Sequence, residues 1–128
     1  MNPLGIYIHI PYCLHKCGYC DFNSHPENQE ESEVYVPALL LEIEHYAQKL
    51  APQTVPTVFF GGGTPTLLPP ASLDKILGKV KQHFNLSADC EITIEANPAT
   101  IKLENLQEIR AAGYNRISIG VQSFDEKE

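Results

Sequence analysis

Four short apolar runs alternate along the chain with three longer stretches in which apolar residues recur at helical spacing. The strand-like runs, which are rich in β-branched and aromatic residues, are 5–10, 57–60, 90–96 and 116–122. The helical stretches are 32–50, 70–84 and 103–113. Strands that alternate with helices of this length pair in parallel through right-handed crossovers. The sequence therefore predicts an α/β fold with the order β-α-β-α-β-α-β.

Polar and glycine-rich residues follow the carboxyl end of each predicted strand. In chain order they are a cysteine-rich loop, residues 61–66, residues 95–98 and residues 122–123. This edge of a parallel sheet is where α/β proteins build their sites. Four consecutive strands that contribute to one rim favour a curved sheet, the N-terminal part of a partial (β/α) TIM-like barrel. A doubly wound sheet would instead concentrate its site at one switch point.

The extent of the chain agrees with part of a barrel. The sequence has 128 residues, enough for a hydrophobic core, and stops soon after its fourth predicted strand. A half-barrel leaves an open sheet edge, which proteins normally avoid. We therefore expect residues 1–128 to be the N-terminal portion of a longer core domain, with the rest of the barrel and a C-terminal domain beyond it.

Single residues predict several local details. Pro37 should lie near the first turn of its helix, where a missing N–H group is tolerated. Gly113 should cap the C-terminus of the third helix. Cys90 should begin the third strand, at the end of the sheet away from the cysteine loop, as a small core residue. In the second helix, one apolar face is expected, made of Leu73, Ile76, Leu77 and Val80.

Charge and hydropathy narrow the function classes. The net charge of −7 argues against non-specific nucleic-acid binding, which needs clustered Lys and Arg. No apolar run approaches the roughly 18 residues of a membrane span. The N-terminus has neither a basic n-region nor a long apolar h-region, so we expect no signal peptide. A cytoplasmic chain is the expectation, and thiols in that reducing compartment stay free or bind metal.

Three cysteines, Cys13, Cys17 and Cys20, lie within eight positions. On a helix they would form a stripe of small buried residues. Pro11 and Gly18, however, argue against a regular helix through this segment. A structural zinc site, completed by a nearby histidine such as His15 or His25, is a second interpretation. Such sites usually present paired C-x2-C knuckles, and only the last two cysteines have that spacing.

An iron–sulfur cluster is the third interpretation, and it accounts for the odd number of thiols. A [4Fe–4S] cluster normally takes four thiolates. Three thiolates leave one iron with an open position, as a catalytic metal requires. An exchangeable ligand with an amine and a carboxylate could chelate that iron, and the methionine end of S-adenosylmethionine (SAM) is such a ligand.

At this point the sequence resembles a known family. The run "CLHKCGYC", a C-x3-C-x2-C pattern with an aromatic residue before the last cysteine, is similar to the cluster motif of the radical SAM superfamily. The runs "GGGTPT", "IEANP" and "GVQSF" occur where that family places cofactor contacts. The resemblance covers nearly the whole chain, and it implies a radical SAM barrel with Cys13, Cys17 and Cys20 as cluster ligands.

The resemblance also implies cofactor contacts for seven further residues, which are Tyr7, Tyr19, Gly62, Gly63, Thr64, Glu95 and Gln122. Tyr19 could stack on the adenine and Tyr7 could reach the methionine end or the cluster. Glycines without Cβ atoms let the backbone approach a ligand, and Glu95 matches a carboxylate that accepts from ribose hydroxyls. The competing interpretations are a core aromatic residue for Tyr7 and a solvated charge for Glu95.

No other motif in the chain predicts a site. The phosphate-binding loop ending G-K-[S/T] is absent after the glycines. The five histidines, which show no paired metal-ligand spacing and are assigned no role, are His9, His15, His25, His45 and His83.

Within the superfamily, the resemblance is to the branch of oxygen-independent coproporphyrinogen oxidase, and within it to HemW-type heme chaperones. The oxidases carry a further cysteine two residues after the cluster motif, where this chain has Phe22, and the run "CDFNSH" resembles the chaperone group. The first motif cysteine is also close to Met1, without the longer N-terminal extension of the oxidases.

The resemblance to this group implies a [4Fe–4S] cluster and SAM as cofactors. It implies heme as cargo, with heme-acceptor proteins and an electron donor as partners. Radical oxidative decarboxylation by a coproporphyrinogen oxidase is the alternative, and a zinc-stabilised binding module is the alternative of another class. The sequence leaves open whether the chain is an enzyme.

Overall fold

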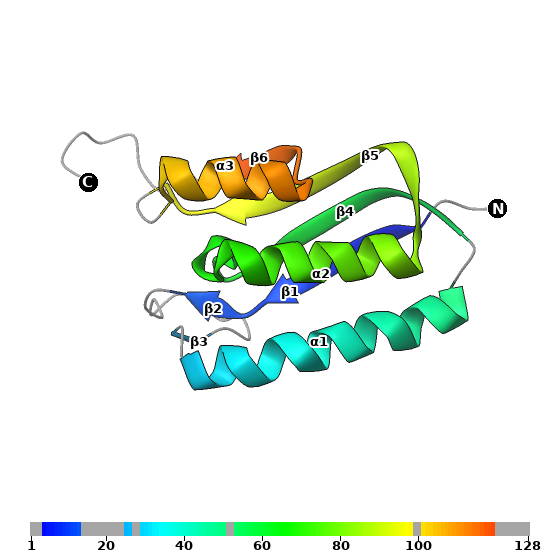
Figure 1. Cartoon of the computed structure of the whole chain (residues 1–128), viewed down its shortest axis with the longest axis horizontal. Coiled ribbons are helices and arrows are strands. Elements are labelled where there is room, and N and C mark those ends of the chain that lie inside the picture. Colours follow the sequence, from blue (N-terminus) through cyan, green and yellow to red (C-terminus); the bar gives the residue numbers. More distant parts are fainter. Residues whose placement is uncertain (1–3, 14–24, 27–28, 51–52, 99–100, 120–128) are drawn as a thin grey trace.

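The computed structural model describes residues 4–13, 25–26, 29–50, 53–98 and 101–119. Its main sheet contains β1 (Gly5–Ile10), β4 (Thr54–Gly62), β5 (Asn85–Ala96) and β6 (Arg116–Ile119), paired in the order β1-β4-β5-β6. All three neighbouring pairs are parallel. The predicted alternation of strands and helices is confirmed (Figure 1).

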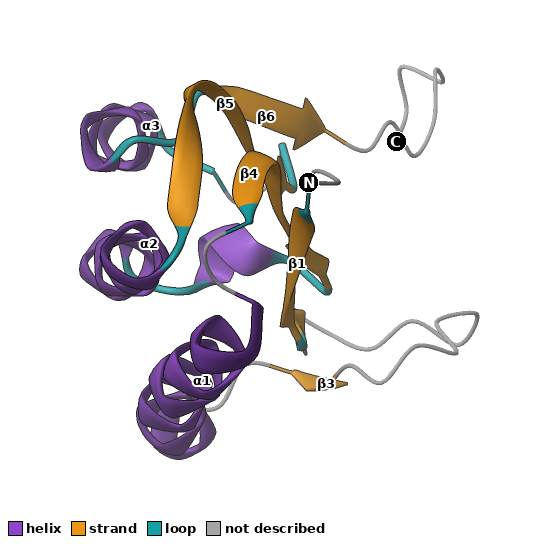
Figure 2. Cartoon of the chain, turned by 90° about the vertical axis from the view of Figure 1, so that its right-hand side faces the viewer, coloured by secondary structure: helices purple, strands orange, loops and turns teal. Residues whose placement is uncertain are grey.

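The helices all cover one face of this sheet (Figure 2). They are α1 (Gln29–Leu50), α2 (Pro70–His83) and α3 (Leu103–Ala112), and each packs against the next. Consecutive parallel strands whose helices stay on one side form the wall of a barrel, because a doubly wound sheet would carry helices on both faces. The prediction of a barrel-type sheet is therefore confirmed.

The core lies between the sheet and the helices. Alternate residues of β1, β4 and β5 face the helices and are buried, among them Ile8, Val58, Phe60 and Ile94. The predicted apolar face of α2 is fully buried against them: Leu73, Ile76, Leu77 and Val80 are all 0% exposed. Burial of each such side chain contributes about 1.5–3 kcal/mol, so this layer holds the sheet in place.

Two strands have bounds that differ from the sequence prediction. β4 begins at Thr54, three residues early, and runs through to Gly62 instead of ending before the glycines, and β5 begins at Asn85, five residues early. The pairing of β4 with β5 is interrupted, because Val55 lies opposite Leu86 and Thr57 lies opposite Glu91. The first part of β5 is separated from the rest by this irregularity. Cys90 therefore lies inside β5, although it is buried in the core as predicted.

Pro37 contradicts its prediction. Helix α1 begins at Gln29, so the proline lies in the helix interior and not near the first turn. A proline there removes one backbone hydrogen bond and costs about 3 kcal/mol. The helix nevertheless continues, because its inner face packs on the core through the buried side chains of Val36, Ile43 and Ala47.

The segment after α3 joins it firmly to the sheet. Gly113 caps the helix as predicted, with φ at +122°. The buried Tyr114 ring meets Phe60 edge-on at 4.9 Å, and its hydroxyl donates to the Leu73 carbonyl at 2.9 Å. The Asn115 side chain accepts from the Ile92 N–H and donates to the Cys90 carbonyl. These contacts fix where β6 begins.

Two further strands, which the sequence analysis did not predict, follow β1. β2 (Tyr12–Cys13) pairs in parallel with β3 (His25–Pro26), with Cys13 opposite Pro26. The pairing brings together the two stems of the cysteine-rich loop at the carboxyl end of β1. After β4, a short 3-10 helix, η1 (Pro65–Leu67), leads toward α2. Over the described ranges, no helix combines the length and apolar character needed to cross a bilayer.

Candidate cofactor site

The face of the sheet opposite the helices carries the candidate site, and we call it the open face. Strand alternation and register place on it Tyr7 beside Phe59, His9 beside Gly61, and Glu95 on the next strand. His9, Gly61 and Glu95 each lie one residue from the carboxyl end of their strand, and Tyr7 and Phe59 lie two residues before His9 and Gly61. The residues predicted for cofactor contact from three different chain segments, Tyr7, Gly62 and Glu95, are thus brought together at one edge.

Glu95 is held by the glycine-rich loop. Its Oε1 atom accepts a hydrogen bond from the Gly62 N–H at 3.1 Å. The side chain is half-buried on the open face, whereas its neighbours Ile94 and Ala96 are buried on the helix side. A carboxylate fixed by a backbone donor is a pre-positioned acceptor, which is what recognition of sugar hydroxyls requires. The interpretation of Glu95 as a freely solvated charge does not fit this geometry.

Gly61 is the point where side chains of three strands meet. A Cβ atom added to it would lie 2.5 Å from Glu95 Oε1, 2.8 Å from Phe59 Cε1 and 2.9 Å from the Tyr7 hydroxyl. All three distances are shorter than real Cβ contacts allow. Only glycine fits here without displacing the site, so Gly61 belongs to the site although the sequence analysis did not assign it a role.

Gly62 and Gly63 fold the loop over the end of β1. Gly62 has φ at +117°, and a Cβ there would lie 2.7 Å from the Ile10 carbonyl oxygen. The Gly63 N–H donates to that same oxygen at 2.9 Å. Glycine is required at position 62 for both conformation and space. Thr64 follows in extended conformation, and its side chain makes no capping bond to η1.

Tyr7 lies on the open face, and the interpretation as a core aromatic residue is wrong. Its side chain is 58% exposed, and its ring stacks on Phe59 with 5.9 Å between centroids and 13° between planes. Its hydroxyl lies 3.4 Å from His9 Nδ1. Loss of hydration raises the pKa of the phenol, and the Glu95 carboxylate adds to the rise. Tyr7 is therefore a neutral hydrogen-bond donor at physiological pH.

His9 and Phe59 are site residues that the sequence analysis missed. Both lie two positions from another open-face residue on the same strand, Tyr7 and Gly61 respectively, and this period of two is the signal that could have identified them. The His9 carbonyl also accepts a hydrogen bond from the Tyr35 hydroxyl of α1. That bond ties the helix following the cysteine-rich loop to the strand preceding it.

The metal-ligand prediction lies mostly outside the described residues. This applies to Cys17, Cys20 and the neighbouring Tyr19, and also to Gln122. For Cys13, the described backbone places it in β2, directly after the carboxyl end of β1. In the described part of the chain, no group of three or more His, Cys, Asp or Glu side chains forms a metal site. The three-thiolate site therefore stays a prediction.

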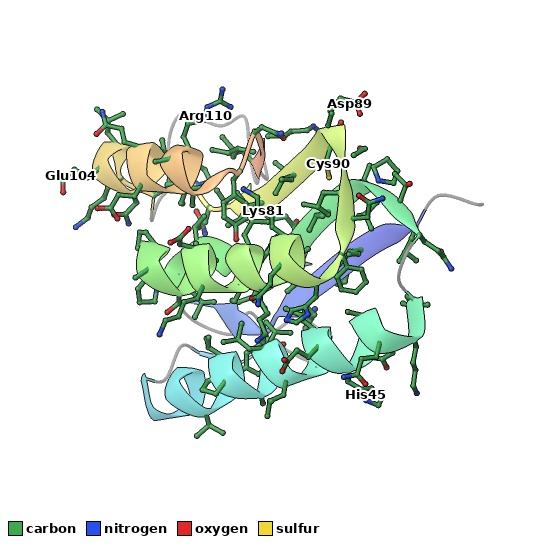
Figure 3. The ribbon with its side chains drawn as sticks, turned by 45° about the vertical axis from the view of Figure 1, so that its right-hand side comes forward. His45, Lys81, Asp89, Cys90, Glu104 and Arg110 are labelled. Carbon is green, nitrogen blue, oxygen red and sulfur yellow. The ribbon has the colours of Figure 1, made fainter. Side chains whose placement is uncertain are left out.

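Cys90 is separate from this site. It lies on β5 near Asp89, at the end of the sheet away from β2 (Figures 1 and 3). Its side chain is 6% exposed, and burial raises the pKa of the thiol, with Asp89 and Glu91 adding to the rise. A buried thiol with a raised pKa is a poor metal ligand and nucleophile, in agreement with the predicted structural role.

A groove of about 360 Å³ runs beside the site, between β1 and α1. It is lined largely by apolar residues, including Ile6, Leu39 and Leu50, with Tyr7 and His9 also on its wall. The candidate site thus has a polar rim at the strand ends and an apolar side.

The residues present fit SAM in the part of the site that is described. Gly61 lets the side chains of Glu95 and Tyr7 meet above it, where Glu95 supplies a fixed acceptor and Tyr7 supplies a neutral donor. Comparison with known proteins then decides the family. The family model described as "Radical SAM superfamily" matches residues 7–127. The chain belongs to the radical SAM superfamily.

Individual relatives of this radical SAM chain fall into two groups. It is 45% identical to the heme chaperone HemW of Escherichia coli over 129 residues, covering 100% of this chain and 34% of that protein. It is 38% identical to the oxygen-independent coproporphyrinogen III oxidase of Salmonella typhimurium over 127 residues, covering 98% of this chain and 28% of that protein. The chain therefore spans about a third of the length of the curated relatives it matches.

A solved structure shows the same fold. The coproporphyrinogen III oxidase HemN of Escherichia coli, described as a radical SAM enzyme, matches 98% of this chain and 29% of its own, with a TM-score of 0.89 and 39% identity. The expected partial radical SAM barrel is thus confirmed. The zinc-stabilised module is not favoured by these findings.

Proposed function

We propose that this chain binds a [4Fe–4S] cluster and SAM, and that it is the cofactor-binding part of a heme chaperone. The observation that carries the proposal is the meeting of Tyr7, Gly61 and Glu95 on the open face, next to the strand in which Cys13 lies. Polar side chains of β1 and β5 meet above a glycine of β4, in the part of the sheet that leads into the cysteine-rich loop, and such an arrangement suits a cluster with a bound small molecule.

Each proposed contact follows from the chemistry of its residue. Cys13, Cys17 and Cys20 hold three irons as thiolates and leave the fourth iron for the amine and carboxylate of SAM. Glu95, fixed by Gly62, accepts from the ribose hydroxyls.

The loop and the aromatic residues complete the proposed pocket. Carbonyl groups of Gly62 and Gly63, with Thr64 beside them, receive the methionine ammonium. The Tyr7 phenol donates toward the methionine end, and Tyr19 stacks on the adenine. Gln122 contributes a further contact from the end of the fourth strand.

A cluster held by Cys13, Cys17 and Cys20 would, once reduced by an external donor, supply one electron for reductive cleavage of bound SAM. The chain's own residues, Tyr7 and Glu95 among them, orient the cofactor. An electron donor is therefore a proposed partner, together with heme and heme-acceptor proteins. We place the protein in the cytoplasm, where a reducing environment keeps the three thiols available.

The chaperone is preferred to the oxidase because of the relatives. HemW of Mycobacterium tuberculosis is 46% identical over 125 residues and HemW of Escherichia coli 45%, against 38% for the Salmonella typhimurium oxidase. To separate the two functions, the full-length protein should be titrated with heme and assayed for decarboxylation of coproporphyrinogen III. Stable heme binding without turnover supports the chaperone, whereas turnover overturns it.

SAM binding is tested with a matched pair of carboxylate variants. Glu95→Gln should weaken SAM binding about tenfold or more in the reconstituted protein, measured by anaerobic equilibrium dialysis, because a neutral amide is a weaker acceptor. Glu91→Gln is the control, since Glu91 lies on the same strand and pairs with the exposed Arg116, away from the glycine-rich loop. Equal SAM affinity in both variants would contradict the assigned role of Glu95.

A further inference from the structure

Phe59 stands out because it is an aromatic residue that faces away from the core. It precedes Phe60 in β4, and strand alternation sends the two rings to opposite faces. The Phe60 ring is 0% exposed and packs edge-on against Tyr114. The Phe59 ring is only half-buried, so the hydrophobic core does not account for it.

The contacts of Phe59 are with site residues. Tyr7 is its direct neighbour across the β1–β4 pairing, and the two rings are stacked nearly parallel at 5.9 Å. The edge of the Phe59 ring also reaches the space above Gly61, where the Tyr7 hydroxyl and Glu95 Oε1 converge. The Phe59 ring thus packs against the Tyr7 ring, and the Tyr7 hydroxyl lies over Gly61.

We propose that Phe59 is a positioning residue for the cofactor: its ring holds the Tyr7 phenol over Gly61, between His9 and Glu95. This inference rests on the proposed function, because it concerns how the SAM site is arranged. Tyr7 is 58% exposed, so without the stacked ring its side chain gains access to other rotamers. An aromatic pair of this kind accounts for a two- to tenfold preference for one arrangement.

A test without any cofactor uses fluorine NMR of the chain labelled with 3-fluorotyrosine. The chain has six tyrosines. The signal that disappears in Tyr7→Phe belongs to Tyr7, and the signal that disappears in Tyr114→Phe belongs to Tyr114. Phe59→Leu should move the Tyr7 resonance and shift its titration midpoint downward, because the phenol becomes better hydrated. The Tyr114 resonance should stay unchanged.

The matched control is the neighbouring phenylalanine. Phe60→Leu should move the Tyr114 resonance and leave that of Tyr7 in place, since the Phe60 ring contacts Tyr114 on the helix side. The positioning role is refuted if Phe59→Leu leaves the Tyr7 signal unchanged. It is also refuted if Phe59→Leu moves the Tyr114 signal as far as Phe60→Leu moves it.

SAM affinity separates this inference from the proposed function. In anaerobically reconstituted protein, Phe59→Leu should raise the Kd for SAM about three- to tenfold, with cluster content unchanged, and Phe59→Tyr should restore it. A wild-type protein that holds a cluster but binds no SAM refutes the proposed function itself. Wild-type binding with an unaltered Kd in Phe59→Leu refutes the positioning role alone.

Discussion

Gly61→Ala is the substitution for which the structure makes its sharpest prediction. The added Cβ would lie 2.5 Å from Glu95 Oε1, 2.8 Å from the Phe59 ring and 2.9 Å from the Tyr7 hydroxyl. Because the φ of Gly61 is not positive, the change brings no backbone strain, and its whole effect falls on the three side chains above it. We expect Gly61→Ala to disturb the site more than the fold.

The expected loss of stability and of SAM affinity in Gly61→Ala follows from the side-chain contacts above residue 61 that must move apart. The three atoms are the far ends of side chains on an open face, so the cost lies at the lower end of the range for overpacking, about 1 kcal/mol, which corresponds to a Tm lower by roughly 3–5 °C for a domain of this size. The Glu95 carboxylate, as the end of a flexible side chain, should yield first and lose its bond from the Gly62 N–H. A hydrogen bond to a charged group contributes about 1.5–3 kcal/mol, so SAM affinity should fall about tenfold or more.

Two other glycines serve as references. Gly62→Ala should cost about 2–5 kcal/mol, because its φ is +117° and its Cβ would press on the Ile10 backbone oxygen at 2.7 Å. Gly78→Ala should stabilise α2 by about 0.5–1 kcal/mol, because a Cβ there meets nothing within 4 Å.

The assay is urea unfolding followed by circular dichroism for all three variants, together with equilibrium dialysis against SAM for the reconstituted proteins. The expected order of stability is Gly78→Ala above wild type, then Gly61→Ala, then Gly62→Ala. Gly61→Ala with wild-type stability and wild-type affinity would refute the convergence of three side chains above this glycine.

Further predictions concern the fold around the site. Pro37→Ala should raise Tm, because it restores a helical N–H at an exposed position and stabilises α1 by about 1–3 kcal/mol; an unchanged or lower Tm would refute this. Asn115→Ala should cost about 1–3 kcal/mol in urea unfolding, because the Ile92 N–H and the Cys90 carbonyl lose their partner; a loss below 0.5 kcal/mol would contradict it. Burial raises the pKa of Tyr114, so its stabilising effect is complete below the unfolded pKa of about 10 and decreases as pH rises further. Tyr114→Phe should therefore be less stable than wild type at pH 7 by about 1 kcal/mol, and this difference should shrink and reverse above about pH 10; a difference that is constant with pH would refute it.

Local patterns predicted most of the secondary structure. The strand 5–10 was predicted with its observed bounds, and the four core residues of α2 followed from helical spacing alone. These succeed because each pattern reports burial of one face of one element. The early start of β5 was missed because residues 87–89, Ser-Ala-Asp, are poor strand formers and lie at an interruption of the pairing.

The site was predicted in parts. Glu95 and Gly62 were identified by resemblance, and the structure adds that the Gly62 N–H donates a hydrogen bond to the Glu95 carboxylate. Phe59, His9 and Gly61 were missed as site residues. The period of two along each strand indicates that they share the open face, but their meeting depends on the register between strands, which no pattern within one strand encodes.

The central claim is that three thiolates hold an iron–sulfur cluster beside this open face. The most direct measurement is the iron and acid-labile sulfide content of the anaerobically reconstituted chain, compared with Cys17→Ala and Cys90→Ala. We predict about four of each per wild-type chain, nearly the same in Cys90→Ala, and loss of the cluster in Cys17→Ala. A colourless wild-type protein that retains one zinc, or equal loss of iron in both variants, would contradict the account.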